Sequence, residues 1–213
     1  MTSRDAVVAL AVCLVFSCGV SAAAAGLPFY NSAEFTPHWL VEDDPALTGF
    51  HQVGEFELMN QFGETILSAD VAGRIYVASF FFSTCPGICP AIRSKLSQVQ
   101  DHFANDPELL ILSHSIRPET DTPAVLLAYA ESNNVVSERW HLLTGDRQAL
   151  YRLARDSYFA NEDLGEIQSN DDFLHTENLL LIDRKGRIRG IYNGLSESSV
   201  RHLIADIEQL QAD

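Results

Sequence analysis

Residues 74–82 (RIYVASFFF) form a nearly continuous run of β-branched and aromatic side chains. A strand that is apolar on both faces is typical of the buried middle of a parallel sheet. In the segment that follows, apolar residues recur every three or four positions, which indicates one face of a helix. They are Ile92, Leu96, Val99 and Phe103. Parallel strands need crossover connections that cover the sheet, so this pair of elements indicates an α/β fold.

The rest of the chain alternates predicted strands and helices in the same way. Strands are predicted at 109–116, 140–143, 177–183 and 187–192, and helices at 122–130, 146–155 and 196–211. A β-hairpin is predicted within 55–67, and the polar, acidic residues 161–172 predict a loop or insertion. The order of elements favours one mixed sheet with helices on both faces and an N-terminal β-hairpin, because strands joined through helices pair in parallel by right-handed crossovers.

The first 25 residues have the pattern of an export segment. An unbroken apolar run at 6–16 follows a basic residue and precedes a stretch of small residues, as in a secretory signal. Counted through to Ala25, the stretch also has the roughly 20 residues that a membrane anchor needs. Residues 15–18 (VFSC) resemble a bacterial lipoprotein box, in which Cys18 would carry the lipid. We predict that residues 1–25 are a signal peptide or an N-terminal membrane or lipid anchor, and that the protein works in the periplasm or on the outer side of the membrane.

Residues 26–53 follow the export segment and carry three prolines and the acidic patch Glu42-Asp43-Asp44 without regular periodicity. We therefore predict an extended linker over residues 26–53 that lies across the domain surface, and one folded domain over residues 54–213. The chain has 14 Lys and Arg against 29 Asp and Glu, a net charge of -15. Such a chain repels phosphates, which excludes nucleic acid as a partner. The acidic surface is either simply solvated or docks a basic partner such as a cytochrome.

Cys85 and Cys89 lie in the segment TCPGICP, where the buried strand ends and a helix begins. Functional sites of open α/β sheets are built at this edge. Pro90 belongs at the helix start, which places Cys89 at or beside the N-cap. Both sulfurs would then face the positive end of the helix dipole, which favours thiolates. The three intervening residues allow a disulfide, a redox-active dithiol or two ligands of one ion.

Two of the seven histidines are predicted to lie near the same edge. His175 directly precedes the strand at 177–183, so it reaches the cysteines if that strand neighbours residues 74–82. Two thiolates and one imidazole suit Cu(I), and hold Cu(II) or zinc if another ligand is added. His114 ends the strand at 109–116 and is either a structural histidine, a ligand or a neighbour of the ligands.

The segment TCPGICP resembles the T-C-P-x-x-C-P signature of the Sco/SenC family. The similarity includes residues 56–63 before this segment, continues after it through residues 118–123, 143–145 and 181–186, and covers roughly residues 54–210. The resemblance implies a thioredoxin-like fold. It also implies copper bound by two cysteines and a distal histidine, and a role in assembling the dinuclear copper centre of cytochrome c oxidase. Some members of the family act chiefly as thiol–disulfide reductases.

Carried over residue by residue, the resemblance assigns Cys85, Cys89 and His175 as copper ligands. Arg117 stands where the family usually has aspartate, and Leu174 precedes the histidine where the family has aspartate. The first hypothesis is an exported factor that supplies copper to, or reduces the cysteines of, the copper-bearing subunit of cytochrome c oxidase. The alternative is an envelope thiol–disulfide oxidoreductase that uses Cys85 and Cys89 on another thiol protein, without a physiological metal. On both hypotheses only the N-terminus contacts the membrane.

Overall fold

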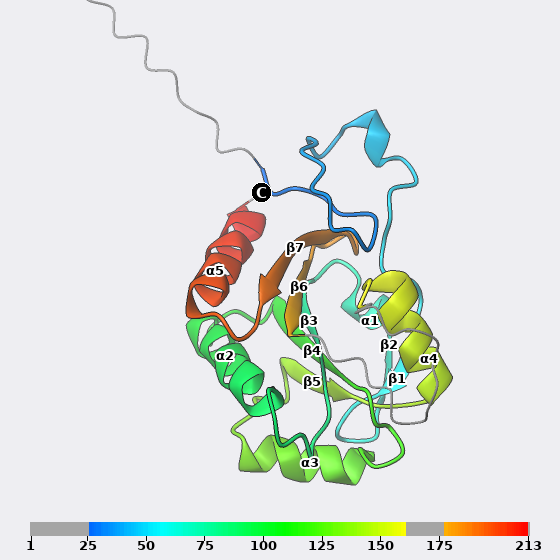
Figure 1. Ribbon diagram of the computed structural model, residues 1–213, viewed down its shortest axis with the longest axis vertical. Coiled ribbons are helices and arrows are strands. Elements are labelled where there is room, and N and C mark those ends of the chain that lie inside the picture. The colour runs from blue at the N-terminus through cyan, green and yellow to red at the C-terminus, as the bar shows by residue number, and fades with distance from the viewer. Residues whose placement is uncertain (1–25, 161–176, 213) are drawn as a thin grey trace, which may run out of the picture.

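The structure, a computed structural model, describes residues 26–160 and 177–212. Its centre is a five-stranded sheet in the order β5-β4-β3-β6-β7 (Figure 1). The strands are β3 (Ile75–Phe81), β4 (Leu109–Ser115), β5 (Trp140–Leu143), β6 (Asn178–Ile182) and β7 (Ile188–Asn193). The first three are parallel, whereas β6 pairs antiparallel with both β3 and β7. The predicted mixed sheet is confirmed.

Helices cover both faces of this sheet. α2 (Cys89–His102) connects β3 to its neighbour β4, and α3 (Pro123–Ser132) connects β4 to the next strand, β5. Both connections therefore advance across the sheet in the same direction. Right-handed crossovers then place α2 and α3 on the same face. Figure 1 shows α5 (Glu197–Ala212) beside α2, and α4 (Arg147–Arg152) on the opposite side of the sheet. The described helices are all too short or too polar to span a bilayer.

The smaller elements agree with the predicted N-terminal hairpin and add two that were not predicted. β1 (Glu57–Met59) and β2 (Thr65–Leu67) form the antiparallel hairpin. The additions are a 3-10 helix at Pro45–Leu47 and the single-turn helix α1 (Ser68–Val71). Neither is long enough to show a helical period in the sequence. The loop predicted at 161–172 lies outside the described residues.

Residues 26–53 pack onto β7 and the turn that precedes it (Figure 1). Phe29 is fully buried, and its ring lies against the guanidinium groups of Arg187 and Arg189, at 4.6 and 3.8 Å from the ring centroid. The backbone N–H of Tyr30 donates to the carbonyl of Ile188 at 3.1 Å. The segment has little regular structure, but Phe29 is part of the protein interior.

Glu42 anchors the same segment through a cluster of charges. Its carboxylate accepts hydrogen bonds from Lys185 (3.2 Å), Arg187 (2.6 Å) and Arg189 (2.7 Å). The two buried guanidinium groups also donate to the buried carboxylate of Asp183, at 2.9 and 3.2 Å. Partial burial opposes ionisation of Glu42, but the hydrogen bonds and positive charges outweigh burial and lower its pKa to about 2.

We expect Glu42→Gln to lower stability at neutral pH and to weaken its dependence on acid. The carboxyl has a lower pKa in the folded protein than in the unfolded chain. Its contribution is therefore complete above the unfolded pKa, near 4.5, and is lost as the pH falls towards 2. Urea unfolding of the parent and variant between pH 7 and pH 2 measures this difference. The matched control is Asp43→Asn, the same change of charge at an exposed neighbour. Parallel pH profiles for the parent and Glu42→Gln would contradict the prediction.

Candidate functional site

The two cysteines occupy the connection from β3 to α2. β3 ends at Phe81, and Cys89 is the first residue of α2, with Ile88 at the N-cap and Pro90 in the first turn. Cys85 N–H donates to the carbonyl of Phe82 at 3.2 Å, which folds the start of the connection into a turn. Both cysteines are free thiols in this structure. The predicted place of Cys89 beside the N-cap is confirmed.

The two thiols have different environments. Cys85 is half-buried, whereas Cys89 is 8% exposed. Burial opposes ionisation of Cys85, but hydrogen bonds from the Cys89 thiol and from backbone N–H groups at 87–89 lower its pKa. Burial, together with the neighbouring Cys85 sulfur, raises the pKa of Cys89. The expectation that the helix start favours thiolate at both sulfurs is therefore wrong for Cys89, because burial and the Cys85 sulfur outweigh the backbone hydrogen bonds that lower its pKa.

This difference suits a pair of thiols in which Cys85 reacts first. The thiolate is the nucleophile in disulfide exchange, and Cys85 is both the more exposed and the more acidic thiol. Cys89 lies within hydrogen-bonding reach of Cys85 and is placed to resolve a mixed disulfide. Two neighbouring sulfurs are also the donor set that soft metal ions prefer.

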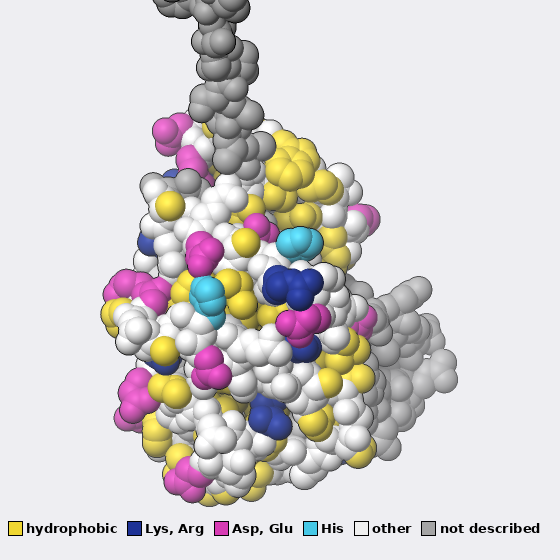
Figure 2. Space-filling model, turned by 90° about the vertical axis from the view of Figure 1, so that its left-hand side faces the viewer, with side chains coloured by type: hydrophobic (Ala, Val, Ile, Leu, Met, Phe, Trp, Pro, Cys, Tyr) yellow, Lys and Arg dark blue, Asp and Glu magenta, His cyan; other side chains and the backbone are white. Residues whose placement is uncertain are grey.

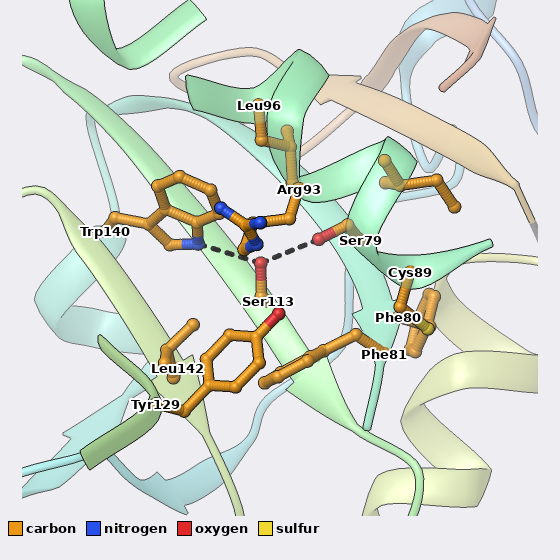
Figure 3. A pocket seen from close by; sticks show the side chains of 11 residues that line it. Ser79, Phe80, Phe81, Cys89, Arg93, Leu96, Ser113, Tyr129, Trp140 and Leu142 are labelled. Atoms are coloured by element: carbon orange, nitrogen blue, oxygen red, sulfur yellow. Dashed lines mark hydrogen bonds between the residues drawn. The ribbon is translucent and has the colours of Figure 1, made fainter. Parts of the chain in front are cut away.

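Behind Cys89, a cavity of about 20 Å³ lies between α2, α3 and the sheet (Figure 3). At its floor, Ser79 Oγ and Ser113 Oγ are 2.8 Å apart, and Trp140 Nε1 donates to Ser113 Oγ at 2.9 Å. Arg93 and Tyr129 line it from the two helices (Figure 3). A cavity of this size holds about one water molecule. It is too small for an organic substrate.

His114 lies on the other face of the sheet from this cavity. It stands opposite Phe80 in the β3–β4 ladder, and its ring stacks on Phe80 with centroids 5.2 Å apart. Its neighbour Ser113 faces the cavity, and alternate residues of a strand point to opposite faces. His114 is fully buried, and burial lowers its pKa to about 4. Of the three roles expected for His114, the structure supports the structural one, since its ring packs among aromatic side chains.

The third predicted ligand, His175, lies outside the described residues. β6 does neighbour β3, with Leu180 opposite Ala78, so the chain enters β6 at the edge of the sheet where β3 ends. The strand pairing on which the placement of His175 depends is therefore confirmed. Within 26–160 and 177–212, His, Cys, Asp and Glu form no group of three or more that could hold a metal ion. The assignment of His175 stays a prediction.

Arg117 and Asp121 follow β4 and lie close to the cysteine turn. The guanidinium of Arg117 lies 4.5 Å from the ring centroid of Phe82, at the end of β3. Asp121 is fully buried and accepts hydrogen bonds from Ser83, two residues before Cys85. The family resemblance includes Asp121 in the block 118–123. Its contact with Ser83 could not be predicted, because hydrogen bonds between residues 38 positions apart leave no periodic signal.

The surface charge is scattered over the face formed by α2 and α5. Figure 2 shows acidic side chains on this face, with basic and histidine side chains between them. Ion pairs contribute to this mixture, such as that between Lys95 of α2 and Glu197 of α5. The predicted docking of a basic partner therefore gains no support from this face.

Comparisons with known proteins agree on one family. The family model described as SCO1/SenC matches residues 45–212. The SCO1 protein homolog of Bacillus subtilis is 26% identical over 160 residues, which cover 74% of this chain and 82% of that protein. A SCO1/SenC family lipoprotein from Bacillus anthracis is 25% identical, with a TM-score of 0.67 over 76% of this chain and 95% of that one. Copper-bound ScoI from Bradyrhizobium japonicum, at 24% identity, shares the fold with a TM-score of 0.60 over 75% and 99% of the two chains.

Proposed function

The chain belongs to the SCO1/SenC family, and on that premise we propose that it is an exported copper-binding factor for the assembly of cytochrome c oxidase. Copper is the cargo, held by Cys85, Cys89 and His175. The observation that carries the proposal is the pair of neighbouring free thiols at the start of α2. Copper bound to the Bradyrhizobium japonicum relative, which has the same fold, supports the choice of metal.

The donor set fits Cu(I) on chemical grounds. Thiolates are soft ligands, and imidazole completes a set of three that suits the ion. Both thiols must lose their protons before they bind, so copper uptake releases protons. The raised pKa of Cys89 makes that proton the harder one to remove, which makes copper affinity rise with pH.

Reduction of a partner's disulfide is the second candidate, and the unequal thiols favour it. The Cys85 thiolate attacks the disulfide, forms a mixed disulfide and releases the first thiolate of the partner. Cys89 then gives up its proton and attacks Cys85 Sγ, which releases the second partner thiolate and leaves a Cys85–Cys89 disulfide. Two electrons pass to the partner, whose cysteines are then ready to take copper.

Export places this chemistry outside the cytoplasm. The export-like pattern of residues 1–25 supports a signal peptide or an anchor, and the Bacillus anthracis relative is described as a lipoprotein. The partner is then the copper-bearing oxidase subunit, reached from the outer side of the membrane.

Complementation of cells that lack the protein tests the assembly role and separates the two candidates. Cys89→Ser and His175→Ala are expressed in such cells, and the copper content and activity of cytochrome c oxidase are measured. Copper delivery requires all three residues, so both variants are expected to leave the oxidase deficient in copper. Normal oxidase with His175→Ala and deficient oxidase with Cys89→Ser would favour the reductase. Normal oxidase with both variants would contradict the proposed function.

A further inference from the structure

Asp121 is a buried carboxylate that joins three segments around the cysteine turn. Ser83 Oγ donates to its Oδ1 at 2.5 Å, and Ser83 N–H donates to both carboxylate oxygens at 3.3 and 3.2 Å. Ser115 Oγ, at the last residue of β4, donates to Oδ2 at 2.6 Å. Asp121 directly precedes Thr122, the N-cap of α3. One side chain therefore links the end of β3, the end of β4 and the start of α3.

These bonds hold the residue from which the cysteine turn departs. Ser83 lies between Phe82, whose carbonyl accepts from Cys85 N–H at 3.2 Å, and the turn itself. The direction in which Cys85 leaves the strand therefore depends on where Asp121 holds Ser83. The other end of the turn is fixed by α2, where the N–H groups of Ala91 and Ile92 donate to the carbonyl of Ile88 at 3.0 Å each. Cys89 is thus held by the helix, whereas the start of the turn that carries Cys85 is held through Ser83 and the Asp121 carboxylate.

We propose that Asp121 is a positioning residue that sets the separation and orientation of the Cys85 sulfur relative to Cys89. A disulfide and a shared metal ion both demand a narrow range of sulfur geometry. Its influence on copper rests on the proposed function, whereas its influence on the dithiol does not. Groups that orient metal ligands without touching the metal typically change the metal affinity by about 10- to 100-fold when they are replaced.

The neighbouring serines supply matched variants. Asp121→Asn keeps the shape of the side chain but replaces one acceptor oxygen with an NH₂ group, so Ser83 N–H loses part of its acceptor. Ser83→Ala removes the 2.5 Å bond on the cysteine side and keeps the backbone bonds. Ser115→Ala removes the 2.6 Å bond to the same carboxylate on the β4 side, away from the turn. Ser83→Ala loses one side-chain hydrogen bond, at the cysteine turn. Ser115→Ala loses two, because Ser115 Oγ also accepts from Arg117 N–H at 3.0 Å. The control therefore removes more bonds than Ser83→Ala but leaves those of Ser83 in place.

The test measures the dithiol–disulfide equilibrium of metal-free protein in glutathione buffers, with thermal unfolding recorded for every variant. We expect Asp121→Asn to shift the equilibrium constant at least tenfold, Ser83→Ala to shift it in the same direction by less, and Ser115→Ala to leave it within twofold. A merely structural role lowers the melting temperature without that pattern, so equal shifts for Ser83→Ala and Ser115→Ala, or none, would overturn the proposal. If Asp121→Asn does not fold, the two serine variants alone decide. The measurement contains no copper, so failure of the parent to bind copper overturns the proposed function and leaves this result standing.

Discussion

Serine in place of Cys85 or of Cys89 is expected to lower the affinity of the reduced protein for Cu(I) by more than about 100-fold. Loss of groups that only orient metal ligands typically costs about 10- to 100-fold, and here a ligand itself is lost. A serine hydroxyl is a hard, weakly acidic donor that does not replace a thiolate for a soft ion. Equilibrium competition with a Cu(I) chelator under anaerobic conditions measures the change.

The two cysteine variants need a control that leaves the thiols intact. Ser94→Ala changes an exposed residue of α2, the helix that begins at Cys89. We expect this variant to bind Cu(I) with the same affinity as the parent. Thermal unfolding of each variant shows whether a loss of affinity reflects a loss of fold. Parental affinity in either cysteine variant would remove that cysteine from the copper site.

Alanine in place of Phe29 is expected to destabilise the protein by about 3–5 kcal/mol, the usual cost of removing a buried phenylalanine. Phe29 is fully buried, and its ring also contacts the guanidinium groups of Arg187 and Arg189. Its loss opens a cavity between residues 26–53 and β7 and exposes a cluster of charges. Urea unfolding at neutral pH, with the free energy extrapolated to water, measures the effect.

Trp39 provides the matched comparison for this variant. It is a large aromatic residue of the same segment but is 66% exposed. Trp39→Ala is expected to change the free energy of unfolding by less than about 0.5 kcal/mol, as surface substitutions usually do. An effect of Phe29→Ala as small as that of Trp39→Ala would contradict a stabilising role for the buried Phe29 ring.

The central fold is predictable from the sequence because its elements are long and buried. β3 is a continuous run of buried residues, and α2 carries a regular apolar face, so each leaves a clear local signal in the sequence. The packing of residues 26–53 leaves no such signal. It depends on Phe29 meeting two arginines about 160 positions later, and single long-range contacts are invisible in local patterns. The burial of Phe29 was therefore not predictable from the sequence.

The candidate site likewise has features that could be predicted from the sequence and features that could not. The spacing of the cysteines and Pro90 placed Cys89 correctly at the start of α2. The different pKa shifts of the two thiols could not be predicted, because they depend on how deeply each sulfur is buried. Asp121 was missed for a related reason, since its role follows from hydrogen bonds to strand ends that only the folded sheet brings together.

Anaerobic titration of the purified, reduced protein with Cu(I), carried out beside its His175→Ala variant, tests the three-residue copper site directly. We expect the parent to bind one copper ion per chain, and His175→Ala to bind it at least about tenfold more weakly. In the Cu(II) form we expect thiolate-to-copper absorption in the parent and an altered band in the variant. A parent that binds no copper, or a His175→Ala variant with parental affinity and spectrum, would contradict a site made of Cys85, Cys89 and His175.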